Sequence, residues 1–434
     1  MNIDDIINSI DSNNLDIAFG RVVNISAVTL SAVGLDVAVG DIVRIESAQK
    51  LYTVLGMVTV LKDGLFVIVP FSFIDGFKIN DKVFLQRDGL TVKCGNGLLG
   101  RVVNALGDPI DDLGKIRDLD TNAPINKESM SPLDRGIIDK KFATGVKAID
   151  SMLTCGKGQK VGIFAGSGVG KSTLMGMIVQ GCEATIKVIA LVGERGREIP
   201  EFIHYNLNNN LENTVIVTAT SDESPLMRKY AAFTAMSIAE YFRDKGHDVL
   251  LMMDSVTRFA MAQREIGLST GEPPVSRGYP PSVFALLPQL MERAGNSKKG
   301  SITAFFTVLV DGDDLNDPIA DQSRSILDGH IVLTRDLTEQ GFYPPINILK
   351  SASRVIDKVV TKEHYNDFLK LKRVLSLIKE NEVLIRVGAY KKGMDLELDS
   401  AIAKKEKARE FLTQGTLEKY SFDEIVANLR KVLI

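Results

Sequence analysis

The chain has 434 residues, of which 45% are hydrophobic and 25% are charged, and its formal net charge is −3. This is the composition of a globular protein with a sizeable core, the length suggests two or three domains, and the acidic balance argues against wholesale binding to nucleic acid or membranes. Three widely spaced cysteines, no leader-like N-terminus and no apolar run of about 18 residues predict a soluble, cytoplasmic protein.

Isoleucines at helical spacing open the chain. Four of them recur with a 3.6-residue period between positions 3 and 10, and Ser12-Asn13-Asn14 ends the pattern. We expect a short amphipathic helix within residues 1–18. Such a helix is too short to be stable alone, so it either packs on its own domain or waits for a partner, and the sequence favours neither choice.

Short strands with a period of two come next. Phe66–Val69 follows the turn signal Asp63-Gly64, and apolar residues alternate with polar or small ones over 35–39. Several such strands, separated by turn residues, are typical of a small β-barrel. We place this barrel domain at residues 19–95.

Apolar strands alternate with helical patterns from about residue 136 to 350, which predicts a mostly parallel α/β sheet. We expect buried strands at 188–192, 249–253 and 304–310. The P-loop domain that holds them is placed at 96–360. Strand patterns disappear afterwards, and residues 361–434 are predicted to form a charge-rich helical domain with helices near 368–378, 397–412 and 422–433.

The octet at 165–172, Ala-Gly-Ser-Gly-Val-Gly-Lys-Ser, is the most informative motif. It lies between an apolar run and a helix-compatible run, the arrangement of a phosphate-binding P-loop. Its N–H groups would cradle phosphate oxygens, Lys171 would reach the β/γ-phosphates, and Ser172 would hold Mg²⁺. Ala165 stands where the strict pattern has Gly, and the bland alternative is an ordinary glycine-rich turn. The predicted nucleotide contacts are Ala165, Gly166, Ser167, Gly168, Val169, Gly170, Lys171, Ser172 and Thr173.

Two carboxylates at strand ends are candidates for the same site. The run 249–253 ends in Asp254, as a Walker B strand does, and the Asp would orient Mg²⁺ and its waters. Glu194 follows the strand at 188–192 and is the candidate general base or water-orienting group, with Arg195 beside it to neutralise phosphate charge. The alternatives are a turn or helix cap for Asp254 and a charged surface turn for Glu194 and Arg195.

Two further residues suit a nucleotide site. Arg354 is a candidate arginine finger, a positive group near the γ-phosphate, although a solvated surface Arg is favoured without further information. Tyr343 precedes Pro344, which holds it in an extended turn, and its ring is a candidate for stacking on a base. The competing interpretation is an ordinary core or turn aromatic.

Six sequence runs carry a resemblance to a known family: Gly100–Asp108, Ala165–Thr173, Gly193–Glu198, Asp254–Glu265, Gly271–Phe284 and Asp328–Leu333. The chain resembles the hexameric rotary-type ATPases, which include the catalytic β subunit of F-type ATP synthase. It is most similar to the type III export ATPases, in particular those of the flagellum. The resemblance covers nearly the whole chain in the order barrel, P-loop domain and helical tail.

The resemblance implies Mg²⁺-dependent hydrolysis of ATP to ADP, coupled to protein export. By position, Lys171 and Ser172 bind phosphate and Mg²⁺. Glu194 matches the catalytic carboxylate, and Asp254 matches the Walker B residue.

Four more roles follow from the resemblance alone. Arg195 and Arg258 are expected near the γ-phosphate, and Tyr343 is expected to stack on adenine. Arg354 matches an arginine finger that is donated across the subunit boundary. The resemblance therefore implies a homohexamer whose active site needs two copies of the chain.

Partners are also implied by the resemblance. The loop from Asp311 to Asp317 resembles one that faces a central stalk protein, and the N-terminal helix would bind a stator-like regulator dimer. Export-gate membrane proteins, export substrates and chaperones are the other expected partners, and no nucleic acid is expected. The implied location is the cytoplasm, peripherally attached to the export apparatus at the inner membrane.

Three alternatives remain open at this point. A virulence injectisome ATPase would share the chemistry but serve other cargo. A non-catalytic nucleotide-binding subunit of a rotary complex is disfavoured, because Lys171, Glu194 and Asp254 are all present. A Rho-type RNA translocase also pairs a barrel with this core, but the acidic balance and the lack of a basic-aromatic stripe in the barrel argue against it.

Overall fold

A closed β-barrel comes first in the described part of the chain. The structure is a computed structural model that describes residues 18–48, 52–87, 89–310, 314 and 316–434. The barrel strands pair in the order β1-β2-β5-β4-β3-β6, with β6 returning to β1. Their inward side chains, such as Val43, Ile45 and Ile68, are fully buried, as barrel closure requires. The strands are β1 (Gly20–Ile25), β2 (Leu30–Val33), β3 (Ile42–Glu46), β4 (Thr53–Lys62), β5 (Leu65–Pro70) and β6 (Lys82–Gln86).

The strand predicted over 35–39 is wrong. These residues form bends and a turn, although Leu35 and Val37 still pack against the barrel core. A loop that covers the end of a barrel also turns alternate side chains inward, so its apolar pattern imitates that of a strand. Residues 1–17, which hold the predicted N-terminal helix, lie outside the described residues.

A nine-stranded sheet forms the centre of the molecule, in the order β19-β18-β12-β17-β15-β13-β14-β8, with β16 pairing beside β17. All its neighbours are parallel except the β18–β19 and β16–β17 pairs, which confirms the predicted α/β class. The strands are β8 (Val102–Val103), β12 (Lys160–Ala165), β13 (Ile186–Glu194), β14 (Thr214–Thr220), β15 (Asp248–Asp254), β16 (Gly295–Asn296), β17 (Ser301–Leu309), β18 (Gly329–Val332) and β19 (Ala352–Ser353).

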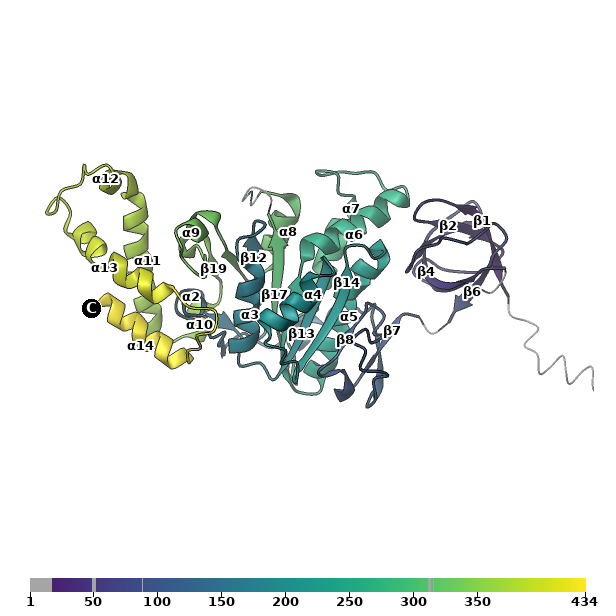
Figure 1. The fold of residues 1–434 in the computed structure, drawn as a ribbon, viewed down its shortest axis with the longest axis horizontal. Helices are drawn as coiled ribbons and strands as arrows, with labels where there is room; N and C mark the ends of the chain where they lie inside the picture. The colour runs from purple at the N-terminus through teal and green to yellow at the C-terminus, as the bar shows by residue number, and fades with distance from the viewer. Residues whose placement is uncertain (1–17, 49–51, 88, 311–313, 315) are drawn as a thin grey trace, which may run out of the picture.

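Helices cover both faces of this sheet (Figure 1). Val188 and Ala190 of β13 join the core under α5 (Pro225–Asp244), α6 (Val256–Ser269) and α7 (Pro281–Met291). Ile189 and Leu191 point the other way, into the core under α2 (Lys147–Met152) and α3 (Lys171–Gly181). A strand buried on both faces reads as a continuous apolar run, which is why these strands were detectable in the sequence.

Shorter elements occupy the connections. β7 pairs with β9 outside the barrel, and β10 pairs with β11. These elements are β7 (Thr91–Cys94), β9 (Thr121–Pro124), β10 (Lys141–Phe142), β11 (Cys155–Gly156), α4 (Glu198–Glu201), α8 (Pro318–Ile326), α9 (Arg335–Glu339) and α10 (Ile356–Val359).

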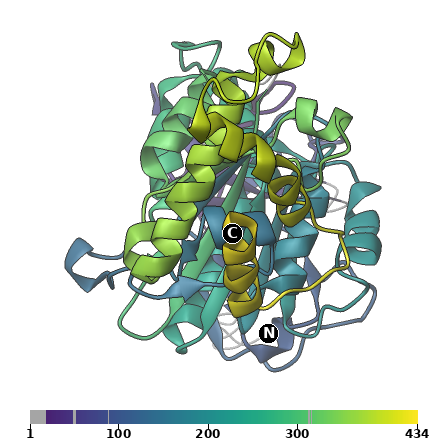
Figure 2. The same ribbon diagram turned by 90° about the vertical axis from the view of Figure 1, so that its left-hand side faces the viewer.

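The chain ends in a helical domain at the opposite end of the sheet domain from the barrel (Figure 1). Figure 2 views the molecule from this end, with α14 across the middle. The predicted helices are confirmed here, since the domain consists of α11 (Lys362–Glu380), α12 (Glu382–Arg386), α13 (Leu396–Leu412) and α14 (Phe422–Leu433). Within the described residues, no helix is both long enough and apolar enough to cross a membrane.

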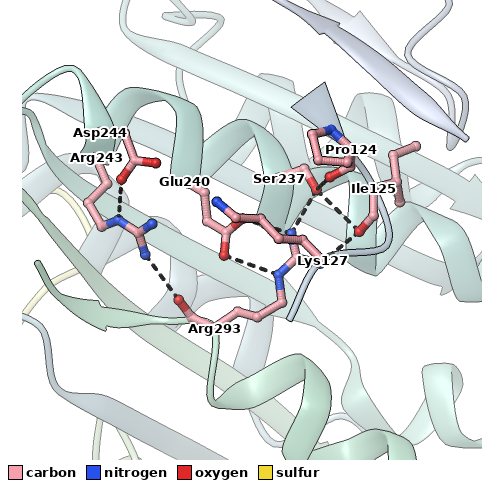
Figure 3. Close-up of polar contacts among 8 residues, drawn as sticks. All are labelled: Pro124, Ile125, Lys127, Ser237, Glu240, Arg243, Asp244 and Arg293. Carbon is pink, nitrogen blue, oxygen red and sulfur yellow. Dashed lines mark hydrogen bonds and ion pairs between the residues drawn. The ribbon is translucent and has the colours of Figure 1, made fainter. Parts of the chain in front are cut away.

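A buried ion pair joins the segment that follows α7 to α5 on one face of the sheet (Figure 3). The guanidinium of Arg293, which is 0% exposed, donates to both oxygens of Glu240 on α5, at 3.1 and 2.8 Å. It also donates to the Ile125 carbonyl and the Ser237 hydroxyl, each at 2.8 Å. All three nitrogens of the buried guanidinium therefore donate hydrogen bonds, as the burial of a charge requires.

Candidate active site

The candidate site lies at the carboxyl edge of the sheet. β12 leads into the 165–172 loop, β13 ends at Glu194, and β15 ends at Asp254. These strands run parallel and are near neighbours, so their ends meet at one edge. Open α/β sheets bind their ligands outside the carboxyl ends of the strands.

The 165–172 loop has the backbone of a phosphate cradle. Gly168 and Gly170 adopt φ of 76° and 97°, which residues with a side chain rarely adopt. Gly170 caps the N-terminus of α3 and has no side chain to accept a hydrogen bond from the first turn. The partial positive charge of that helix end therefore faces the loop and suits an anion.

Lys171, the first residue of α3, points its ammonium at both predicted carboxylates. It forms a very short contact with Asp254 Oδ1, and its Nζ lies 3.6 Å from Glu194 Oε1. Burial opposes its charge, but the two carboxylates outweigh burial and raise the pKa of Lys171. The structure thus brings together the residues that the sequence assigned to phosphate, metal and water.

Glu194 is held in a state suited to proton transfer. Burial raises its pKa to about 7, the charge of Lys171 opposes this shift, and Asp254 adds to it. Its Oε1 atom is buried and has no hydrogen-bond partner among the described residues. A carboxylate with a pKa near neutrality and an open acceptor can orient and deprotonate a water molecule.

The Asp254 side chain is held by a residue of the neighbouring strand β17. The Asp254 side chain is 5% exposed, and the Thr307 hydroxyl donates to Oδ1 at 2.7 Å. The peptide bond from Asp254 to Ser255 is cis, and the Ser255 hydroxyl accepts from the Arg258 N–H at 3.3 Å, capping α6. Asp254 therefore lies at the junction between β15 and α6.

Arg258 and Arg195 have different surroundings. A methyl group at Gly193, whose φ is 69°, would lie 2.9 Å from Arg258 Cβ, so the glycine lets Arg258 pass close to the strand end that carries Glu194. The Nε atom of Arg258 is buried without a hydrogen-bond partner among the described residues. The Arg195 side chain is 69% exposed and lies 3.8 Å from Glu198, so the structure does not bring it into the cluster.

Tyr343 lies against the P-loop. A methyl group at Gly170 would be 3.2 Å from its ring, and its buried hydroxyl has no hydrogen-bond partner among the described residues. Its carbonyl accepts from the Gln414 N–H at 2.8 Å. Gln414 belongs to the C-terminal domain, so that domain braces the turn that carries the ring.

Arg354 lies away from the cluster. It is exposed, its N–H donates to the Asp328 carbonyl, and its guanidinium donates to the Arg324 carbonyl at 3.3 Å. The Asp328 N–H donates to the carbonyl of Lys160, which is the first residue of β12. The P-loop follows the last residue of that strand, Ala165. The six residues of β12 span roughly 16 Å, which an arginine side chain cannot bridge.

The residues around the 165–172 loop fit a nucleoside triphosphate with Mg²⁺. Polar atoms of Glu194, Arg258 and Tyr343 are buried around the loop without partners, and such groups normally find one. Phosphate oxygens, metal-bound water and the edge of a base supply the donors and acceptors that these atoms lack. The Ser172 hydroxyl, at the start of α3 beside Lys171, adds an oxygen ligand of the kind that Mg²⁺ prefers.

Sequence comparison identifies the family. The model of the ATP synthase alpha/beta family, nucleotide-binding domain, matches residues 145–353, and the model of the T3SS EscN ATPase C-terminal domain matches residues 360–431. A flagellum-specific ATP synthase of Helicobacter pylori (strain J99) is 57% identical over 416 residues, which cover 96% of this chain and 95% of the relative. The chain belongs to the ATP synthase alpha/beta family.

Further similarity assigns it to the type III export branch of that family. The flagellum-specific ATP synthase of Bacillus subtilis is 47% identical, over 95% of this chain and 94% of the relative. The structure of the assembled ATPase EscN from the type III secretion system of enteropathogenic E. coli is 44% identical, with a TM-score of 0.91 over 96% of this chain and all of that one. The chain is therefore an ATPase of the alpha/beta family, with the three-part architecture expected from its sequence.

Several contacts in the site were not predicted from the sequence, among them those of Thr307 and Arg335. Thr307 touches Asp254, and Arg335 donates to the Ser167 carbonyl of the P-loop at 3.2 Å. A signal existed for Thr307, because it is the one hydroxyl in the apolar run 304–310 and a buried hydroxyl must find a partner. No local pattern marks Arg335, which reaches the loop from α9.

Proposed function

We propose that this chain hydrolyses Mg²⁺-bound ATP in a homohexameric ring and so energises or gates the type III export of flagellar proteins. The observation that carries the proposal is the convergence of Lys171, Glu194 and Asp254 from three elements at one sheet edge. The flagellum-specific names of the relatives from Helicobacter and Bacillus support the cargo.

Each residue has a task in the proposed chemistry. Glu194 orients the attacking water and accepts its proton, while Lys171 and the P-loop amides hold the phosphates. Bound Mg²⁺ would supply charge neutralisation at the phosphates, held by Ser172 and by Asp254 or its waters. Arg258, whose Nε atom is buried, is the cation that lies against the strand end carrying Glu194, whereas Arg195 would have to turn inward to reach the phosphates.

Tyr343 is proposed to fix the base. Its ring already lies against the backbone of Gly170, so an adenine stacked on it would hold the triphosphate over the loop. Its buried hydroxyl, which has no hydrogen-bond partner among the described residues, gives the ring one polar atom for a ligand.

Arg354 is proposed to act in a neighbouring subunit. It is exposed and lies at the far end of β12 from its own P-loop, so as an arginine finger it must serve another copy. A closed ring gives every site one such finger and repeats the same contact at each boundary. The assembled state named for EscN supports this arrangement.

Other partners are proposed from the relatives. EscN has also been seen in complex with its central stalk EscO, at 44% identity and a TM-score of 0.89 over 96% of this chain and all of that one. We propose a stalk protein for the loop around Asp314, a regulator dimer for the N-terminal helix, and export-gate proteins, substrates and chaperones at the cytoplasmic face of the inner membrane. The domain limits 18/19, 95/96 and 360/361 remain predictions.

An injectisome ATPase is the second candidate. A type 3 secretion system ATPase of Xanthomonas euvesicatoria is 43% identical, over 95% of this chain and 94% of the relative. Deletion of the gene distinguishes the flagellar assignment from the injectisome assignment. Loss of flagella and motility would support the flagellar one. Intact flagella with loss of effector secretion would replace it.

The ring is tested by the rate of ATP hydrolysis per subunit, measured against protein concentration. We expect the rate to rise cooperatively with concentration, because a site completed by a neighbour does not exist in a monomer. A rate per subunit that stays constant down to concentrations at which the protein is monomeric by light scattering would contradict the shared site.

A further inference from the structure

β17 carries three buried hydroxyls toward the α3 side of the sheet, those of Ser301, Thr303 and Thr307. Thr303 and Thr307 are both 0% exposed, and they share a face with Phe305, which packs in the core under α3. Their partners lie at opposite ends of the strand. Thr303 accepts from the Gly158 N–H at 2.9 Å, whereas Thr307 donates to Asp254 Oδ1 at 2.7 Å.

The position of β17 explains how Thr307 reaches the site. β17 lies between β12, which carries the P-loop, and β15, which carries Asp254. Thr307 is in register with Ile163 of β12, and Phe306 is in register with Met253, so Thr307 and Asp254 are side by side at the strand ends. Among the hydrogen bonds of the described residues, the one from Thr307 is therefore the only one that the Asp254 side chain receives from a neighbouring strand of the sheet.

Two donors compete for the same carboxylate oxygen. Asp254 Oδ1 accepts from Lys171 and from Thr307, and the ammonium is the partner that the phosphates would draw away. Once Lys171 turns to a bound triphosphate, the hydroxyl remains as a fixed donor to Oδ1. The other carboxylate oxygen of Asp254, Oδ2, would then be available to the metal or its waters.

We infer that Thr307 is a positioning residue that orients Asp254 toward Mg²⁺ when nucleotide binds. The inference rests on the proposed Mg²⁺ role of Asp254. Hydrogen bonds that orient a metal-binding carboxylate set metal affinity, and their loss typically costs about 10- to 100-fold. Thr307 would therefore influence the metal-dependent part of nucleotide affinity and leave the metal-free part unchanged.

The test compares nucleotide affinity with and without Mg²⁺, using the fluorescent analogue mant-ADP and the full-length protein. Wild type is expected to bind more tightly with Mg²⁺ than with EDTA. Thr307→Val keeps the shape of the side chain and removes the donor, so the Mg²⁺/EDTA affinity ratio should fall by about 10-fold or more, with the EDTA value unchanged. Thr307→Ser should restore the ratio.

Thr303→Val is the matched control, because it removes a buried hydroxyl from the same strand and face, at the end away from Asp254. It should keep the wild-type ratio even if its melting temperature falls. A wild-type ratio in Thr307→Val, or an equal loss of affinity with Mg²⁺ and EDTA, would overturn the inference. If the wild-type protein bound mant-ADP equally well with Mg²⁺ and with EDTA, both the metal role of Asp254 and the inference would be overturned. The ATPase proposal is tested separately, by the loss of hydrolysis expected in Lys171→Ala.

Discussion

Lys171 and Asp254 form an ion pair between the first residue of α3 and the last residue of β15, across 83 residues of sequence. Glu194 lies on the other side of the same ammonium, 3.6 Å from it. The cation proposed to bind phosphate thus lies between the two carboxylates proposed to act on metal and water. Binding of a triphosphate would exchange these partners of Lys171.

Replacement of Lys171 by Ala should reduce hydrolysis by at least about 10²–10³-fold, because the phosphates lose their closest cation. It should also raise the pKa of Glu194 further, since the charge that opposes that shift disappears. Steady-state release of phosphate measures the first effect. The exposed barrel residue Lys62 provides the control, and Lys62→Ala should hydrolyse ATP at the wild-type rate.

The activity should depend on pH through Glu194. Its pKa is raised to about 7, so the group is mostly protonated at about pH 6 and mostly charged at about pH 8. Because the base must be charged to accept a proton, kcat/KM should rise across this window and level off above it. Glu194→Gln should lose about 10²–10⁴-fold in rate and show no such rise. A wild-type profile that is flat over the window would exclude Glu194 as the base.

Local pattern was sufficient to predict the glycine loop at 165–172 and the two strand ends that carry Glu194 and Asp254. Glycines at 168 and 170 are needed for the backbone itself, and an apolar run that stops at a carboxylate marks the carboxyl edge of a buried strand. The same reasoning failed at residues 35–39, where a strand was predicted and a loop is found. Alternating apolar residues show that every second side chain is buried, but they do not show that the backbone pairs with another strand.

Contacts that depend on strand order were not predictable. Thr307 meets Asp254 only because β17 lies between β12 and β15, an order that one sequence does not reveal. The pairing of Arg293 with Glu240 is of the same kind, as it joins α5 to residues beyond α7. The exposure of Arg195 could not be predicted either, because the sequence of a charged turn is the same whether its side chains face solvent or substrate.

The Arg293–Glu240 pair should be critical for folding stability. Arg293→Ala leaves the buried Glu240 charge without its bidentate partner, which should cost about 3–5 kcal/mol of unfolding free energy. Urea unfolding followed by circular dichroism measures the loss. The double variant Arg293→Met with Glu240→Leu removes both charges and should recover most of it. Equal stability of Arg293→Ala and wild type would show that the network contributes little.

Two inactive variants should rescue one another if Arg354 acts across a subunit boundary. Arg354→Ala removes the finger but keeps the P-loop, and should lose about 10³-fold or more in kcat while still binding nucleotide. Lys171→Ala keeps the finger and lacks a working loop. In a mixed ring, a site with Lys171 can face a neighbour with Arg354, which occurs at about a quarter of the boundaries in a random equal mixture. We therefore expect hydrolysis to return when the two proteins are mixed and allowed to assemble, whereas a mixture with the double variant Lys171→Ala, Arg354→Ala in place of Lys171→Ala should stay inactive. If mixing restores nothing although the rings form, the finger belongs to its own subunit or has no part in hydrolysis.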